Sequence, residues 1–243
     1  MNREPLTIYW APYWPASLKW DLNHIYPSPE SLHSEWFAKY TPQRRPDVYF
    51  NCPASSNKMK RTFVFNNIVD THAKFNDDGS IEYDRPDRYQ MLNELIHQPT
   101  INDHRLINVQ YSLLVFCEES VVASMESPFF HKTKAFEYGA IVPGEFDIGK
   151  WYRPLNAEFQ LWENVNELHL AANEPIFYLE FLTERKIVMK RYQVTKRLST
   201  IASSLIHVNP LNRFASLTEK YEVFKQSRLR SQILKDIKNN LVD

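Results

Sequence analysis

From residue 106 onward, apolar and polar residues follow one another as they do in β-strands. In EFQLW (158–162) and LHL (168–170) apolar residues alternate with polar ones, so each strand would bury one face and expose the other. Similar segments recur at a spacing of roughly ten residues, with no helical pattern between them. They are INVQYSLLVFCEES, GAIVPGEFDI, AEFQLWE, ELHLAA, PIFYLEFLT and KIVMKRYQVT. The pattern predicts an α+β protein whose core is an antiparallel, jelly-roll-like β-sandwich and not a parallel α/β sheet.

The first hundred residues predict short helices and strands around this core. A helix is expected over Ser31–Tyr40, because serines can cap its first turn and its apolar residues share one face. The segments DVYFNCP (47–53) and RTFVFNN (61–67) predict strands. A second short helix is expected over Arg88–His97, ended by Pro99.

The segment FNDDGSI (75–81) has the glycine and acidic residues of a calcium loop. Lys74 and Arg85, however, occupy the first and twelfth ligand positions, where such a loop needs acidic side chains. The segment therefore predicts a hairpin turn around Gly79.

An aromatic arm, YWAPYWPASLKW (9–20), precedes these elements. Its prolines favour extended backbone over helix. The arm could stack on sugars, bases or a proline-rich peptide, or it could be a strand that covers one end of the core. Both interpretations stay open at this point.

The last 45 residues predict helices with an apolar stripe and a basic opposite face. The stripe consists of Phe214, Leu217, Tyr221, Phe224, Ile233, Leu234, Ile237 and Leu241. We therefore divide the chain into a β-sandwich domain with its aromatic arm, residues 1–197, and a helical extension, residues 198–243. A free helix of this length is only marginally stable in water, so the stripe must pack on the sandwich or on another subunit.

Charge is distributed unevenly although the net charge is zero. Residues 184–243 hold 13 basic and 5 acidic residues, whereas the preceding residues hold 16 and 24. The basic end favours protein partners, such as a homo-oligomer or phage virion subunits bound through the C-terminal helix, over nucleic acid. The alternative is a solvated basic helix balanced within the chain.

Three of the chain's four glycines fall within eleven residues, at Gly139, Gly144 and Gly149. Each lies where a strand-like segment stops or restarts, which predicts a tight structural corner with bulges or positive φ angles. The alternative is a close approach of the backbone to a ligand. So few glycines leave no phosphate-binding loop of either common type.

A ligand or partner contact is predicted beside this corner, in a groove at Trp151 and Arg153. Glu174 would be presented at a strand start, and His169 would occupy a solvent-facing or groove position. The catalytic residues are unknown, and no metal or cofactor is predicted, because the histidines do not form the short motifs that metal sites use. Cys52 and Cys117 predict small buried hydrophobic residues without a disulfide. No apolar run is long enough to span a membrane, which predicts a protein of the host cytoplasm or a virion that is not secreted.

Three segments resemble a family of proteins of unknown function encoded by tailed bacteriophages, including T4-like phages of marine bacteria. They are VQYSLLVFCEES (109–120), IVPGEFDIGKWYRPLNAEFQLWE (141–163) and NEPIFYLEFLT (173–183). The resemblance covers residues 106–195. It departs from the family pattern at Asn173, which replaces a glycine, and at Asp147, which is separated from Trp151.

This resemblance implies a phage protein and supplies no catalytic residues. The first hypothesis is a non-enzymatic binding, structural or accessory module that docks partner subunits. The second is a cupin-like enzyme, or a protein that binds a small carbohydrate or nucleotide in the groove near Trp151 and Arg153.

Overall fold

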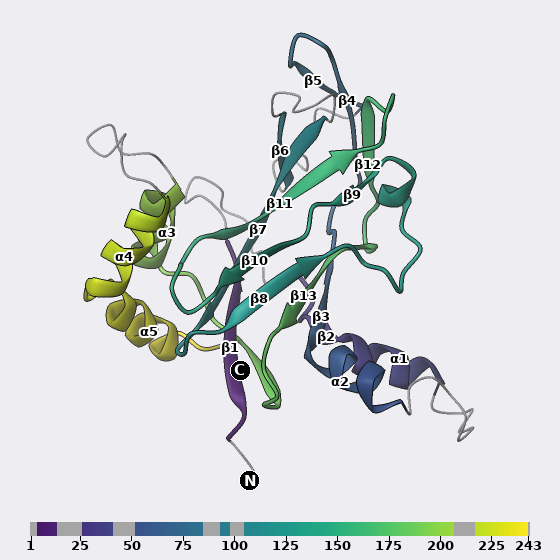
Figure 1. Cartoon of the computed structure of the whole chain (residues 1–243). Helices are drawn as coiled ribbons and strands as arrows, with labels where there is room; N and C mark the ends of the chain where they lie inside the picture. Colours follow the sequence, from purple (N-terminus) through teal and green to yellow (C-terminus); the bar gives the residue numbers. More distant parts are fainter. Residues whose placement is uncertain are drawn as a thin grey trace.

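Antiparallel strands dominate the computed structural model of the chain, and helices pack on both sides of them (Figure 1). The structure describes residues 4–13, 26–40, 52–84, 93–97, 105–206 and 217–242. The fold is therefore mixed α+β with mostly antiparallel sheets. Among the described helices, none is long and apolar enough to cross a membrane.

The largest sheet has six strands and is organised around one long strand, β7 (Leu106–Cys117). Its order is β14 (Ile187–Arg191), β1 (Leu6–Pro12), β7, β11 (Pro154–Leu161) and β9 (Gly139–Ile141), and β6 (Asn93–His97) also pairs with β7. β11 pairs with one edge of β7. The other edge of β7 pairs with β6 through β7 residues 107–111 and with β1 through β7 residues 113–117. Among the described strands only β1 and β14 pair in parallel.

A five-stranded and a three-stranded sheet complete the β structure. The first has the order β10 (Gly144–Asp147), β8 (Val122–Glu126), β13 (Pro175–Phe181), β3 (Thr62–Asn66) and β2 (Glu30–Ser31). The second has the order β12 (Glu167–Leu170), β4 (Thr71–Phe75) and β5 (Ile81–Tyr83). One core cluster contains side chains from all three sheets, including Trp10, Val115, Phe159, Phe177 and Leu168.

The outer face of the six-stranded sheet is covered by the C-terminal helices (Figure 1). These are α3 (Lys196–Ile206), α4 (Leu217–Gln226) and α5 (Leu229–Asn239). Leu114 and Phe116 face the helices, whereas Leu113, Val115 and Cys117 face the main core. A strand that is buried on both faces needs a continuous hydrophobic run, which explains the sequence LLVFC.

The apolar stripe of α5 is buried on the chain's own sheet, through Ile233 and Ile237. Its basic residues add polar contacts to the segments that follow β7 and β10. Lys238 pairs with Glu118 at 2.6 Å, and Arg230 Nε donates to the carbonyl of Gly149 at 2.8 Å. The apolar stripe and part of the basic face therefore dock within one chain.

The outer face of the five-stranded sheet is covered by two N-terminal helices, α1 (Leu32–Tyr40) and α2 (Pro53–Arg61). Leu32 and Met59 pack on Val64 of β3 and Tyr178 of β13. These two strand residues point away from the main core, because neighbouring residues of a strand face opposite sides.

Several local predictions are confirmed. The helix over residues 31–40 is α1, and Ser31 Oγ accepts a hydrogen bond from the Ser34 backbone N–H at 3.2 Å, as a cap does. The turn at residues 75–81 joins β4 and β5, and Gly79 has a φ of 84°. Within the aromatic arm, residues 9–12 belong to strand β1, with Tyr9 and Trp10 buried on opposite faces. The rest of the arm beyond Tyr13 lies outside the described residues.

Other local predictions are wrong. Residues 93–97 of the predicted second helix form strand β6, because the edge of β7 offers them unpaired backbone groups; residues 88–92 lie outside the described part. Pro53 begins helix α2 instead of ending a strand, and Cys52 is exposed instead of buried. Residues 47–51 of that predicted strand are outside the described part. Cys117 is buried, as predicted.

Candidate functional site

The glycine corner owes its shape to close packing and not to unusual backbone angles. None of its three glycines has a positive φ. A Cβ on Gly139 would lie 2.1 Å from the Gln160 carbonyl oxygen, and one on Gly149 would lie 1.9 Å from that of Glu119. Gly144 begins strand β10 with nothing within 4 Å of such a Cβ, so the prediction of a constrained corner residue is wrong there. Its place on the edge strand of the sheet leaves room for a side chain.

Trp151 and Arg153 lie beside Tyr221 of helix α4. Trp151 is only 5% exposed, and its ring centroid is 4.3 Å from that of Tyr221. Burial lowers the pKa of Arg153, and the neighbouring Tyr221 and Glu158 oppose that shift. The predicted groove is therefore occupied by the chain's own C-terminal helix.

Glu174 lies elsewhere, at the opposite end of the five-stranded sheet. It precedes Pro175, which pairs with Asn66, whereas Asp147 on the way to Trp151 pairs with Val122 at the other end. The Glu174 carboxylate accepts a hydrogen bond from the Lys134 backbone N–H at 2.7 Å. This carboxylate therefore caps the short 3-10 helix Lys134–Glu137.

His169 is on the exposed face of the three-stranded sheet. It stands opposite His72 in the β12–β4 pair, with ring centroids 5.4 Å apart, and its Nε2 lies 2.9 Å from an Asp70 oxygen. His72 contacts Asp84 and Glu167. In the described part of the chain, no three His, Cys, Asp or Glu side chains are arranged to hold a metal ion. The four predicted contact residues therefore do not form one site.

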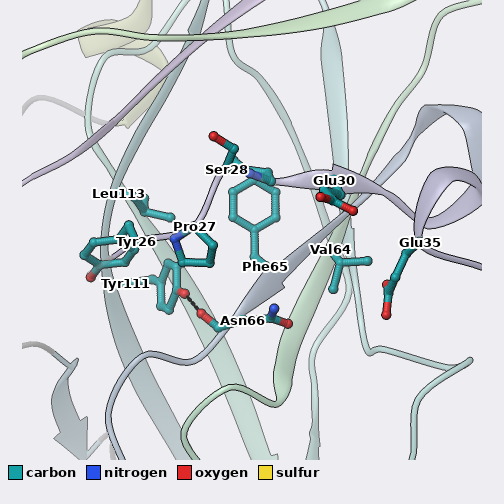
Figure 2. A pocket seen from close by; sticks show the side chains of 11 residues that line it. Tyr26, Pro27, Ser28, Glu30, Glu35, Val64, Phe65, Asn66, Tyr111 and Leu113 are labelled. Carbon is teal, nitrogen blue, oxygen red and sulfur yellow. Dashed lines mark hydrogen bonds between the residues drawn. The ribbon is translucent and has the colours of Figure 1, made fainter. Parts of the chain in front are cut away.

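A cavity of about 220 Å³ lies at another place, between the segment 26–30 and strands β3 and β7 (Figure 2). Its wall is formed by Tyr26, Pro27, Ser28, Pro29, Glu30, Glu35, Val64, Phe65, Asn66, Tyr111 and Leu113. The rings of Tyr26 and Tyr111 meet edge to face at a centroid distance of 6.1 Å. Aromatic and aliphatic walls with a few polar groups are typical of small-ligand sites.

Asn66 and Tyr111 supply polar groups to the cavity wall (Figure 2). The Tyr111 hydroxyl donates a hydrogen bond to the main-chain carbonyl of Asn66. Burial raises the pKa of Tyr111 well above its ordinary value, so the hydroxyl keeps its proton at neutral pH. The side-chain Oδ1 of Asn66 is buried and has no hydrogen-bond partner among the described residues. A buried acceptor without a partner costs free energy, which a bound donor would recover.

Glu35 joins the cavity to a hydrogen-bonded network. His131 Nε2 lies 3.0 Å from Glu35 Oε1, and His131 Nδ1 is hydrogen-bonded to the Tyr178 hydroxyl. Burial raises the pKa of Tyr178, with the Glu35 charge adding to this effect. Tyr178 therefore keeps its proton at neutral pH, and His131 links its hydroxyl to the Glu35 carboxylate.

Two acidic residues of the five-stranded sheet, Asp147 and Glu180, have structural partners. Asp147 accepts from the Gly149 backbone N–H at 2.9 Å and pairs with Lys150 at 2.7 Å. Glu180 is 4% exposed and pairs with Lys58 at 2.8 Å and Arg61 at 2.7 Å. These contacts hold turns and helices in place.

Sequence reasoning missed the cavity because its wall comes from separate parts of the chain. Tyr26 and Glu35 come from the chain between β1 and β3, whereas Tyr111 comes from the centre of β7. The one local signal is YPSPE (26–30), in which two prolines hold the backbone extended beside an aromatic residue.

Comparisons of the chain with protein-family models, with curated proteins and with solved structures found no match.

Proposed function

We propose that the protein is a binding protein that holds a small ligand in the cavity under residues 26–30. The observation that carries the proposal is the buried Asn66 Oδ1, which faces no hydrogen-bond donor among the described residues. A ligand that donates to this oxygen recovers the free energy of the missing hydrogen bond. The neighbouring rings supply apolar contact area.

The protonation and hydrogen bonding of Tyr111 in the cavity wall favour binding over catalysis. Tyr111 stays protonated and is already engaged as a donor, so it does not serve as a nucleophile. The polar groups that remain bind and orient a ligand. This site replaces the groove that the sequence suggested at Trp151 and Arg153.

The test is ligand-observed NMR of the full chain with a library of small cations, anions, sugars and neutral compounds. At least one compound should bind the wild type and lose binding in Asn66→Leu, which has a similar volume and keeps the main-chain carbonyl that Tyr111 uses. Asn239→Leu, an exposed asparagine on α5, is the matched control and should bind normally. A library in which Asn66→Leu behaves like the wild type throughout would refute the proposal.

A second proposal is partner docking, which the sequence suggested first. Phe37 and Phe129 are 55% and 49% exposed on the side of the molecule that carries α1. Large exposed aromatic side chains are common at protein interfaces. We propose another protein chain as the occupant, and Phe129→Ser should weaken its association in analytical ultracentrifugation. The phage origin stays a prediction from the resemblance and calls for mass spectrometry of purified particles.

We also propose that the two larger sheets form a β-sandwich of the jelly-roll type. Support comes from the facing side chains of both sheets, which share one core cluster. An experimental density map would test the packing angle and the strand connections.

A further inference from the structure

The side-chain carboxamide of Asn66 offers a ligand both a donor and an acceptor. Among the described residues, none is hydrogen-bonded to its buried Oδ1 or to its Nδ2. The Asn66 main chain is held separately: it pairs with Pro175, which has no N–H, and the Tyr111 hydroxyl donates to its carbonyl. The strand therefore fixes the position of the carboxamide without using its polar atoms. Another amide-like edge, with an N–H next to a C=O, complements such a group.

The rest of the cavity wall lacks several hydrogen-bond donors. Pro27 and Pro29 have no backbone N–H. The hydroxyl proton of Tyr111 is already bonded to the Asn66 carbonyl. The carboxyl oxygens of Glu30 and Glu35 add acceptors to the same wall. A ligand with more than one N–H group suits this wall.

The lining has no cationic group that could pair with an anion. None of its residues is a lysine, arginine or histidine. Arg191 lies outside the lining, with Nη1 3.4 Å from the Tyr26 carbonyl and its guanidinium 4.9 Å from the Trp10 ring centroid. A phosphate or carboxylate on the ligand would lose hydration without gaining a cationic partner. An ammonium group, in turn, has no acceptor for Asn66 Nδ2. A neutral ligand therefore fits best.

Aromatic rings and the small volume favour a single flat ring. Phe65 stacks on Phe177 with ring centroids 5.3 Å apart, and it lines the cavity next to Asn66 (Figure 2). Tyr26 and Tyr111 add two further rings to the wall. Rings that pack on one another gain stability beyond the area they bury. The volume of about 220 Å³ is below the range of roughly 300–1,000 Å³ that drug-sized ligands need.

We infer that the cavity binds a flat, neutral single ring with N–H groups next to a carbonyl, as in a cyclic amide or a pyrimidine base. The inference rests on the proposed ligand-binding function and names the class of ligand. A free base and the base of a nucleoside share this chemistry.

The experiment is isothermal titration of the full chain at neutral pH with uracil and three relatives, each of which changes one feature. Dimethyluracil, methylated at both ring nitrogens, has no N–H and should bind at least about 10-fold more weakly than uracil. Dihydrouracil has a puckered ring and should bind at least about 3-fold more weakly, because it stacks less well. Orotate adds a carboxylate and should bind at least about 10-fold more weakly. Uridine distinguishes the two sources: binding as tight as that of uracil indicates a nucleoside, and weaker binding indicates a free base.

A variant of Asn66 locates the ligand. Asn66→Asp has nearly the same shape but replaces the Nδ2 donor with a second acceptor, so it should weaken uracil binding about 10-fold or more. Asn239→Asp, at an exposed asparagine on α5, is the matched control and should leave binding unchanged. If Asn66→Asp loses its circular dichroism spectrum, the titrations of the wild type still test the class of ligand.

The outcomes separate this inference from the proposed function. No binding of uracil, equal binding of uracil and dimethyluracil, or tighter binding of orotate would overturn the ligand class. Equal binding of dihydrouracil would overturn the requirement for a flat ring. An Asn66-dependent ligand of another kind would then still leave the binding site in place, whereas absence of any Asn66-dependent ligand would overturn both.

Discussion

Gly149→Ala should destabilise the protein, whereas Gly144→Ala should not, although both replace glycines of the same segment. The added Cβ at position 149 would meet the Glu119 carbonyl oxygen at 1.9 Å and its carbonyl carbon at 2.7 Å. Both atoms belong to the backbone, which cannot turn aside as a flexible side chain can. At position 144 nothing lies within 4 Å, so the methyl group meets only open space.

The expected loss of stability in Gly149→Ala depends on which backbone segment must shift to relieve the overlap. Relief of the overlap shifts the turn after β7, where Lys238 pairs with Glu118, or the turn at Gly149, whose carbonyl accepts from Arg230. Overpacking of this kind costs about 1–3 kcal/mol. Gly144→Ala removes backbone freedom from the unfolded chain at a place without strain, so it should stabilise the protein by up to about 0.5 kcal/mol.

The assay is urea denaturation followed by tryptophan fluorescence and far-ultraviolet circular dichroism. The midpoint of Gly149→Ala should fall, and that of Gly144→Ala should stay or rise. Equal destabilisation by both substitutions would refute the packing explanation and restore a special backbone role for Gly144. An unchanged urea midpoint in Gly149→Ala would show that the turn can shift without a loss of stability.

Two further perturbations test the helices on either side of the sheets. Burial alone would raise the pKa of Glu180, but hydrogen bonds and charges from Lys58 and Arg61 hold it below its ordinary value of 4.5. Its stabilisation is therefore complete above the unfolded-state pKa and is lost as the pH falls through the lower folded-state pKa. The wild-type urea midpoint should drop more steeply than that of Glu180→Gln between about pH 6 and about pH 3, and parallel curves would contradict this assignment. Truncation after Arg213 should uncover Phe116 and increase the binding of a hydrophobic dye, and a soluble truncated protein that binds no dye would argue against the docking of α4 and α5.

Some features could be predicted from the sequence alone because they depend on interactions between residues that are close in the chain. Ser31 caps α1 because its hydroxyl reaches a backbone N–H three residues away. Gly79 takes a positive φ because a tight hairpin requires it. The alternation in residues 158–161 and the helical stripe at Ile233 and Ile237 identified buried faces, because a strand or helix repeats its orientation over a few residues.

Tertiary structure decided the features that depend on distant neighbours. Gly149 needs to be glycine because of Glu119, thirty residues earlier, and no local pattern reveals that contact. Residues 93–97 became a strand because β7 had a free edge, which outweighed their helical pattern. Trp151 was buried by α4, although the sequence placed it in a groove.

Every part of the candidate site depends on tertiary structure in the same way. Tyr26, Glu35, Asn66 and Tyr111 meet only after β3 and β7 have joined different sheets and residues 26–30 have crossed between them. The sequence determined which side chains are apolar, acidic or aromatic and which short segments they occupy. The folded chain alone decided which of them share a cavity, because long-range packing sets distances that local periodicity does not encode.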